Sequence, residues 1–300
     1  MKTVALISHY APSLVNFRGP LIRDLVAAGA RVYALAPDFD DDLRQQVMDL
    51  GARPVDYSLS RTGMNPLRDG LDTLRLAALL RRLRPDVTLG YTIKPVIYGT
   101  LAAWLAGVPR RVAMITGLGY LFSPSNDPAS RRRELLRAMA ARLYKFALAG
   151  AHKVVFQNPD DLREFIGAGL VAQGKAVNLG GTGVDLQEWP LMPPVTRPVT
   201  FLLAARLLRE KGIVEYAEAA RRVKARHPDV RFILLGGPDT NPGGVYADEV
   251  QAWVEEGLLE WPGHVPVKPW LAQASVYVLP SYYREGVPRS TQEAMAMARP

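Results

Sequence analysis

The chain of 300 residues contains no cysteine. Disulfides, cysteine-ligated metal sites and cysteine nucleophiles are therefore excluded together, and the absence fits a reducing compartment. The four histidines (His9, His152, His227 and His264) do not have the spacing of metal ligands. The motifs HExxH, GxSxG and GxxxxGK[ST] are also missing, which argues against zinc proteases, serine hydrolases and P-loop kinases.

Long apolar runs are missing as well. The longest, from Pro95 to Pro109, is shorter than the ~18 residues of a membrane-spanning helix. The apolar run after Met1 is too short for a signal peptide, and no small-residue cleavage site follows it. We therefore expect a cytoplasmic protein, peripheral on the inner face of the cell membrane if it contacts membrane at all.

The composition is that of a folded, basic protein. Apolar residues make up 48% of the chain, and its length suits two domains. The net charge of +8 favours anionic partners: nucleic acid, phosphorylated small molecules or an acidic membrane face. A solvated basic surface explains the charge equally well. Nucleic acid is disfavoured because no recognised binding module occurs.

Short apolar runs alternate with longer amphipathic segments. This pattern predicts an α/β protein with parallel sheets covered by helices on both faces. The alternation pauses at a proline-rich stretch, so we predict two doubly wound domains, residues 1–185 and 199–300, joined by a linker over residues 186–198. The chain stops at Pro300 directly after a predicted helix, and we expect the second domain to be truncated or unusually small. The predicted strands are Thr3–Ser8, Arg31–Ala36, Val87–Tyr91, Arg111–Thr116, Lys153–Phe156, Val199–Ala205, Arg231–Leu235, Leu259–Trp261 and Val276–Leu279.

Two carboxylates follow the last predicted strand. Glu285 lies in a loop, and Glu293 lies in a helix that begins near Pro288, where proline is favourable. Ligands of open parallel sheets bind outside the carboxyl ends of the strands, so both carboxylates can face a cleft between the domains. Such a pair can hold sugar hydroxyls, bind a metal or perform acid–base chemistry. A helix cap at Glu285 and a surface position for Glu293 explain the same spacing.

Two cations follow the first strand of the second domain. Arg206 and Lys211 lie in a loop that opens a helix, where backbone N–H groups and the helix dipole favour an anion such as a diphosphate. A basic turn on the surface is the alternative, and it is our interpretation of Arg209, which Glu210 can neutralise. No Asp-x-Asp motif accompanies this sheet edge, so we expect no metal.

In the first domain, polar residues follow three strands. Asn16 and Arg18 lie in the loop after the first strand, where the GxGxxG of NAD and FAD sites is missing. Lys94 and Thr116 follow later strands and reach the same edge. These four residues are candidate contacts to an acceptor. The glycines from Gly180 to Gly183 favour a hinge, and residues 236–239 favour a turn.

Two segments combine arginines with leucines. Leu67–Arg84 and Arg131–Lys153 have the pattern of basic amphipathic helices lying on an anionic membrane. Ordinary helices that cover a sheet and expose a basic edge would have the same pattern.

Taken together, the motifs of the second domain resemble a known family. Pro280-Ser281, Glu285-Gly286 and Glu293-Ala294 resemble the Glu-x7-Glu signature of family 4 glycosyltransferases, which are retaining enzymes of the GT-B fold. Arg206, Lys211 and the segment Gly183-Val184-Asp185 fall where this family has its diphosphate-binding pair and its hinge loop. In the first domain, Asn16-Phe17-Arg18, Thr92–Pro95 and Thr116–Gly119 resemble bacterial transferases that act on undecaprenyl-diphosphate sugars.

The resemblance implies a retaining transfer of an N-acetylhexosamine or a hexose from a UDP-sugar to a polyprenyl-diphosphate-linked saccharide. It implies Arg206, Lys211 and Glu285 as catalytic residues. It implies that the nucleotide sugar is bound by these three residues together with Gly286, Val287 and Glu293. His264, between Gly263 and Val265, is a candidate contact to the base, with uracil expected and guanine as the alternative. No cofactor and no metal are expected. A nucleotide-sugar epimerase of similar fold and a non-catalytic nucleotide-sugar-binding protein remain as alternatives.

Overall fold

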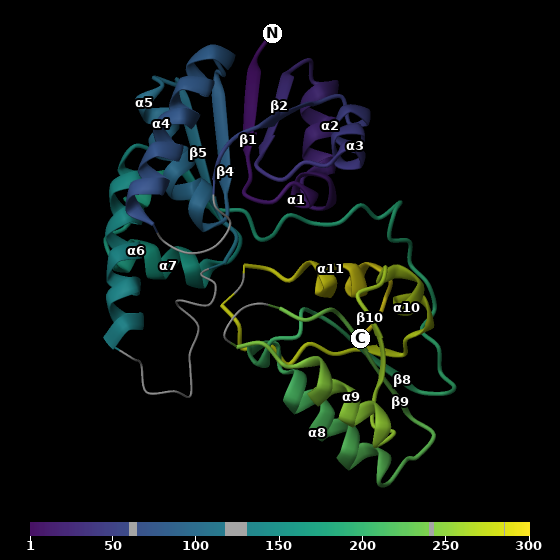
Figure 1. Cartoon of the computed structure of the whole chain (residues 1–300). Coiled ribbons are helices and arrows are strands. Elements are labelled where there is room, and N and C mark those ends of the chain that lie inside the picture. The colour runs from purple at the N-terminus through teal and green to yellow at the C-terminus, as the bar shows by residue number, and fades with distance from the viewer. Residues whose placement is uncertain (60–64, 118–130, 240–242, 285) are drawn as a thin grey trace. The chain divides into compact units, whose positions relative to one another are not determined.

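The chain forms two compact units. The computed structural model describes residues 1–59, 65–117, 131–239, 243–284 and 286–300. One unit ends at Thr182 and the other runs from Gly183 to Pro300. Each unit is a parallel sheet with helices on both faces (Figure 1), which confirms the predicted pair of doubly wound sheets. In the described ranges, no helix is long and apolar enough to cross a bilayer.

The first unit is built on seven parallel strands in the order β3-β2-β1-β4-β5-β6-β7. Strand order reverses between β1 and β4, which pair directly. This is the topological switch point, where the loops that follow the two strands part to opposite faces. The strands are β1 (Thr3–Ile7), β2 (Arg31–Ala36), β3 (Arg53–Asp56), β4 (Val87–Tyr91), β5 (Arg110–Ile115), β6 (Lys153–Phe156) and β7 (Ala176–Asn178).

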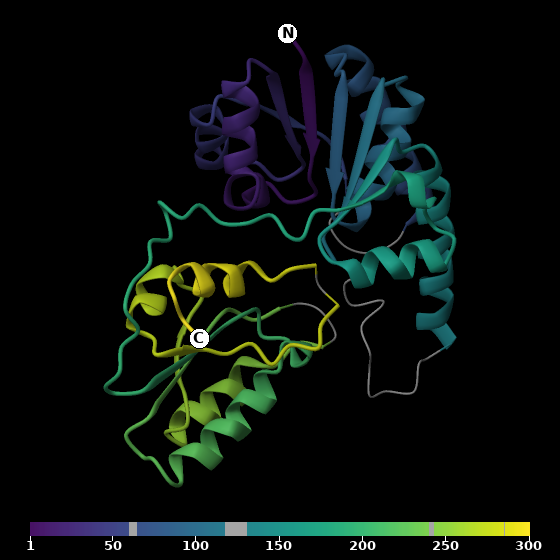
Figure 2. The same ribbon diagram turned by 180° about the vertical axis from the view of Figure 1, so that it is seen from behind.

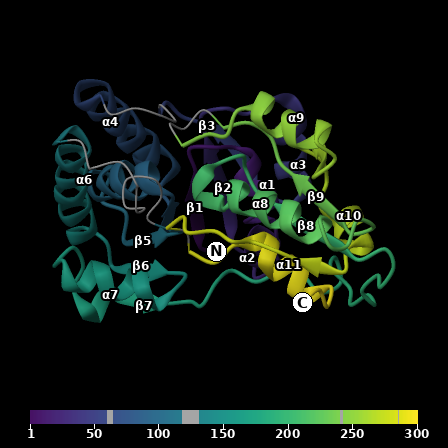
Figure 3. The same cartoon turned by 90° about the horizontal axis from the view of Figure 1, so that it is seen from below.

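Side chains of β1 alternate between two cores. Val4 and Leu6 pack with α1, α2 and α3, whereas Ala5 and Ile7 pack with α4 and α5 on the opposite face. Figures 1 and 2 show these two groups of helices on either side of the strands, and α7 lies beside β6 and β7 (Figure 3). The helices are α1 (Pro12–Asn16), α2 (Gly19–Ala27), α3 (Asp41–Asp49), α4 (Pro66–Leu83), the π-helical turn η1 (Pro95–Gly99), α5 (Thr100–Leu105), α6 (Arg131–Ala149), α7 (Pro159–Gly167) and the short turn η3 (Gln173–Lys175).

The second unit has four parallel strands in the order β10-β9-β8-β11, so its switch point lies between β8 and β11. Leu203 and Leu234 pack with α8 and α9, whereas Leu202 and Leu235 pack with α10 and α11 on the other face. The elements are β8 (Thr200–Ala204), η4 (Arg209–Lys211), α8 (Ile213–Lys224), β9 (Arg231–Leu235), α9 (Ala247–Glu255), β10 (Glu260–Gly263), α10 (Lys268–Gln273), β11 (Val276–Tyr277) and α11 (Arg289–Ala296).

The proline-rich stretch over residues 186–198 packs onto the second unit. Trp189 is buried in the core beneath α10 and α11. The amide of Val195 donates to the carbonyl of Ala274 at 3.3 Å. This stretch is therefore fastened to the sheet that it precedes.

Three elements differ from those expected from sequence. The loop predicted after β1 contains the helix α1, which Pro12 favours because its fixed φ suits a first helical turn. The strands β3 and β7 were not predicted. Each is at most four residues long and lies at an edge of the sheet, so neither has the apolar run of a central strand.

Candidate functional site

Four loops meet at one edge of the second sheet. Because β8, β9, β10 and β11 are parallel, the residues that follow them all lie at the carboxyl edge. The loop after β8 carries Arg206, the loop after β9 carries Asp239, the loop after β10 carries His264, and the loop after β11 carries Tyr283. The candidate site of this unit is built from these loops.

Arg206 is held by an acid that sequence reasoning missed. Its Nη1 donates to Oδ2 of Asp239 at 2.6 Å. Desolvation lowers the pKa of Arg206, but the Asp239 carboxylate and the Tyr283 hydroxyl outweigh it, so the pKa lies above its ordinary value. Residues 236–239 were expected only to turn the chain. No local signal could reveal Asp239, since its partner lies 33 positions away.

Lys211 shares an aromatic partner with Arg206. Its Nζ lies 5.1 Å from the centroid of the Tyr283 ring, and Cζ of Arg206 lies 5.9 Å from the same centroid. Both distances are within the range of cation–π attraction. The two cations that sequence analysis paired are therefore brought together in space, and Tyr283 is a second residue that it missed.

The loop after β11 is fastened to η4 through one carbonyl. The oxygen of Glu210 accepts hydrogen bonds from the amides of Tyr282 and Tyr283, at 2.9 and 3.0 Å. Glycine makes this approach possible. Gly212 has φ of +75°, and a Cβ there would lie 2.3 Å from the Pro280 oxygen. The two loops thus pack backbone against backbone.

Glu293 lies on α11 and is buried, with 8% of its surface exposed. Nε of Arg289 donates to its Oε1 at 2.7 Å. Burial raises the pKa of Glu293 above its ordinary value, since it outweighs the opposite effect of Arg289, and the nearby charge of Glu188 adds to the rise. The predicted partner of Glu293, Glu285, lies outside the residues that the structure describes, so their pairing stays a prediction.

The remaining residues assigned to the nucleotide sugar lie near the same edge. His264 is exposed, and a Cβ built on Gly237 would lie 3.5 Å from its Cβ. Gly286 and Val287 are half-buried between β11 and α11. The structure therefore places His264 beside Gly237 in the loop after β9, and this loop also carries Asp239.

In the first unit, two side chains meet across the switch point. Nδ1 of His9, which follows β1, lies 2.6 Å from Oγ1 of Thr92, which follows β4. Thr92 has φ of +69°, an unusual conformation for a β-branched residue. Strain of this kind is concentrated at functional positions. The contact between His9 and Thr92 could not be predicted from the sequence, in which the two residues are 83 positions apart.

Two of the four candidate acceptor contacts point into the protein. Arg18 is 4% exposed, and its guanidinium lies 4.6 Å from the centroid of the Tyr91 ring. Lys94 is 7% exposed, and its Nζ lies 3.0 Å from Oδ1 of Asp69. Asn16 is exposed at the end of α1, and Thr116 is half-buried after β5. Arg18 and Lys94 thus bond to protein groups instead of lining an open loop.

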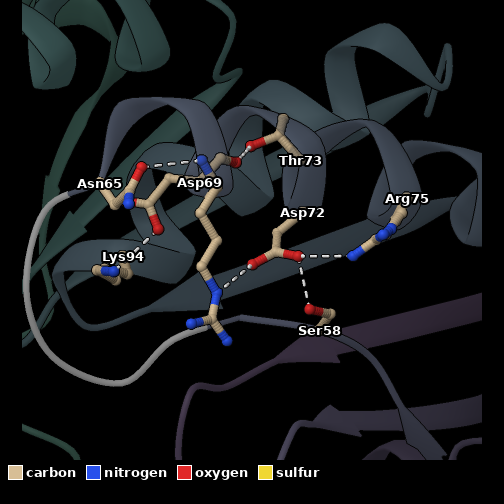
Figure 4. A network of polar contacts seen from close by, with 8 residues as sticks. Ser58, Asn65, Asp69, Asp72, Thr73, Arg75 and Lys94 are labelled. Carbon is tan, nitrogen blue, oxygen red and sulfur yellow. Dashed lines mark hydrogen bonds and ion pairs between the residues drawn. The ribbon is translucent and has the colours of Figure 1, made fainter.

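Lys94 belongs to a buried network on α4, shown in Figure 4. Asp69 and Asp72 each have side chains that are 1% exposed. Asp72 accepts a hydrogen bond from Ser58 at 2.5 Å and lies 3.5 Å from Nη1 of Arg75. In the ranges that the structure describes, this network included, no three His, Asp or Glu side chains are grouped to hold a metal.

Family models match nearly the whole chain. The glycosyl transferase 4-like domain matches residues 18–180. The domain of glycosyl transferases group 1 matches residues 198–300.

Two curated proteins are similar in sequence. The N,N'-diacetylbacillosaminyl-diphospho-undecaprenol alpha-1,3-N-acetylgalactosaminyltransferase of Campylobacter jejuni is 28% identical over 99% of this chain and 78% of its own length. The UDP-Gal:alpha-D-GlcNAc-diphosphoundecaprenol alpha-1,3-galactosyltransferase of Escherichia coli is 24% identical over 78% of this chain and 61% of its own length.

Solved structures share the fold. A glycosyltransferase from Rickettsia africae superposes with a TM-score of 0.71 at 15% identity, covering 99% of this chain and 78% of that one. Anabaena HepE, solved with UDP and glucose, superposes with a TM-score of 0.67 at 16% identity, covering 100% and 79%. The two sheets are those of the GT-B fold. The family models and the two curated relatives favour a transferase over the epimerase and the non-catalytic binder. The chain is a glycosyltransferase that belongs to the glycosyl transferase 4-like family, with a group 1 glycosyltransferase domain in its second half.

Proposed function

We propose that this glycosyltransferase moves a sugar from a UDP-sugar to a polyprenyl-diphosphate-linked saccharide in bacterial glycan assembly, with retention of the anomeric configuration. One observation carries the proposal. Arg206 and Lys211 meet at Tyr283, at the carboxyl edge of the second sheet, where parallel sheets bind their ligands. Both curated relatives are named for diphosphoundecaprenol-linked substrates, and one is named for UDP-Gal.

The second unit would bind the donor. Arg206 and Lys211 would neutralise the diphosphate through charge-assisted hydrogen bonds, which strengthen as negative charge develops on the leaving group. Glu293 would accept hydrogen bonds from ribose hydroxyls, a role that suits an ionised carboxylate. His264, Gly286 and Val287 would contact the nucleotide or its sugar, and Glu285 would contact the donor sugar. With two fixed cations at the phosphates, we expect no requirement for a metal.

The reaction would exchange one bond at the anomeric carbon. The bond from that carbon to the β-phosphate oxygen breaks, and its electron pair leaves with UDP. An acceptor hydroxyl oxygen forms the new bond on the same face, and its proton passes to the departing phosphate. This course gives retention without a covalent intermediate, and no carboxylate nucleophile is assigned.

The first unit would bind the acceptor. Asn16 and Thr116 lie at the edge where β1 and β5 end, near the switch point spanned by His9 and Thr92. Arg18 and Lys94, being buried, would shape this edge from beneath.

A row of exposed leucines on α4 supports peripheral contact with a membrane. Leu67, Leu71 and Leu74 are 84%, 56% and 60% exposed, and their spacing places them on one side of the helix. Arg68 and Arg75 on the same helix have side chains that are 67% and 70% exposed. Leucines flanked by arginines suit an anionic lipid surface. We propose that α4 rests on the inner face of the cell membrane.

A panel of nucleotide sugars tests the donor. The protein is incubated with each UDP-, GDP- and TDP-sugar and a polyprenyl-diphosphate-linked saccharide, and nucleotide release is measured. We expect release of UDP only, and only when acceptor is present. Release without acceptor, or from GDP-sugars alone, would contradict the proposal.

A further inference from the structure

Tyr283 occupies the switch point of the second sheet. It follows β11, and the cations of the loop after β8 lie against its ring, so the contact joins the two strands at which strand order reverses. Nothing in the spacing of the carboxylates or of the two cations assigned a role to this residue. Its position nevertheless puts it where a ligand of the sheet is expected.

The position of the Tyr283 ring reduces the electrostatic repulsion between Arg206 and Lys211. Two positive groups converging on one diphosphate repel each other, and Lys211 is largely removed from water, with 8% of its surface exposed. The negative face of an aromatic ring attracts a cation at such distances. With Nζ of Lys211 at 5.1 Å and Cζ of Arg206 at 5.9 Å from its centroid, the ring offsets part of that repulsion.

The backbone fixes the ring in place. The amide of Tyr283 donates to the Glu210 carbonyl at 3.0 Å and contacts Oγ of Ser281 at 3.2 Å. Arg206 is held from its other side by Asp239 at 2.6 Å. The neighbouring Tyr282 makes the same backbone bond to Glu210, but its side chain is 41% exposed. The chain therefore offers a matched control one residue away.

We propose that Tyr283 is a positioning residue, whose ring holds the Arg206 and Lys211 side chains in the arrangement that binds a diphosphate. The inference rests on the proposed function, since it assigns a role within the proposed donor site. It predicts that the aromatic ring contributes more than the hydroxyl, although the hydroxyl also bonds to Arg206. It also predicts that the ring increases the affinity for UDP more than the affinity for UMP, which lacks the second phosphate.

The test compares UDP with UMP by calorimetry for the full chain and three variants. Y283L should bind UDP about tenfold more weakly than wild type, since losing a partly desolvated cation–π contact costs an effect of that order. Its affinity for UMP should fall less, so the UDP-to-UMP affinity ratio falls. Y283F keeps the ring and loses only the hydroxyl that bonds to Arg206, so its UDP affinity should stay within about threefold of wild type, and Y282L should match wild type.

The outcomes separate this inference from the proposed function. A wild-type protein that binds no UDP contradicts the proposed function. If wild type binds UDP, unchanged binding by Y283L overturns the positioning role. Equal losses of UDP affinity in Y283L and Y283F also overturn the positioning role of the ring, because the hydroxyl would then account for the whole effect. A loss in Y283L that is the same for UMP as for UDP overturns it too, as general damage to the site. Thermal unfolding of each variant checks that the second unit remains folded.

Discussion

The guanidinium of Arg206 donates to the carboxylate of Asp239 across 2.6 Å, joining the loops that follow β8 and β9. The acid orients the cation, yet its negative charge also opposes any phosphate that approaches the same edge. These two effects act in opposite directions on a diphosphate ligand. A substitution that keeps the hydrogen bond and removes the charge separates them.

The substitution D239N separates the orientation of Arg206 from the repulsion of phosphate, because asparagine retains a carbonyl oxygen that can accept from Arg206 but carries no charge. We expect UDP to bind about three times more tightly at low salt, since one unit of negative charge has left the edge of the site. The gain should shrink as salt rises, because salt screens a half-exposed pair. Calorimetric titration with UDP at two salt concentrations measures both effects. Weaker binding at low salt would mean that the charge of Asp239 is needed to orient Arg206.

Removing Arg206 or Lys211 should reduce catalytic activity far more than removing the neighbouring Arg209. For R206A and for K211A we expect kcat/KM to fall about a hundredfold, as is typical when one donor to a developing negative charge is lost. Arg209 provides the control, because it lies in the same loop but pairs with Glu249 at 2.8 Å. R209A should stay within about threefold of wild type. A loss in R209A equal to that of R206A would indicate general disruption of the loop.

The sequence predicted the fold more completely than the site. Apolar runs of central strands such as β1 and β8 are strong signals because both faces of these strands are buried. The strands β3 and β7 lie at sheet edges and lack that signal. Arg206 and Lys211 could be proposed because they lie close together in one loop. Asp239, Tyr283 and His9 could not, since each acquires its partner only when parallel strands bring distant loops to one edge.

The burial of Lys94 makes the stability of the first unit sensitive to its partner. D69A should destabilise this unit by about 3–5 kcal/mol, because it removes the carboxylate from a buried ammonium. The double variant D69L/K94M should be much less destabilised, because neither charge of this pair remains buried without its partner. Urea unfolding measures these differences. D160N is the control, since the pair of Asp160 with Arg163 is exposed and should contribute under about 1 kcal/mol.

Glu293 should make the second unit less stable as pH rises. Its pKa is raised in the folded state, so that state binds the proton more tightly than the unfolded chain does. This contribution is complete below the ordinary value of 4.5 and is lost as pH rises through the raised pKa. E293Q lacks it, and the stability of E293Q relative to wild type should therefore increase with pH over this window.

A second variant checks the sign of that pH dependence. Hydrogen bonds from Arg222 and Arg221 lower the pKa of Glu218. Its contribution is therefore present above 4.5 and is lost as pH falls through the lowered pKa. Urea unfolding measured from below to above pH 4.5 should show stability relative to wild type rising with pH for E293Q, mainly above 4.5, and falling with pH for E218Q, mainly below 4.5. Equal slopes would show that Glu293 does not titrate as its burial requires.

The leucine row on α4 can be tested against an apolar residue on the other face of the sheet. Leu71 and Leu74 are more than half exposed, and inserting them into lipid would remove apolar surface from water. L71Q/L74Q should reduce binding to anionic vesicles at least about tenfold, while M48Q, on α3, should have no effect, although Met48 is 48% exposed. Because arginines flank the row, wild-type binding should also weaken as salt rises. Vesicle co-sedimentation measures these differences in binding, and thermal unfolding checks that the first unit of each variant remains folded. If the double variant and M48Q bind alike, α4 does not lie on the membrane.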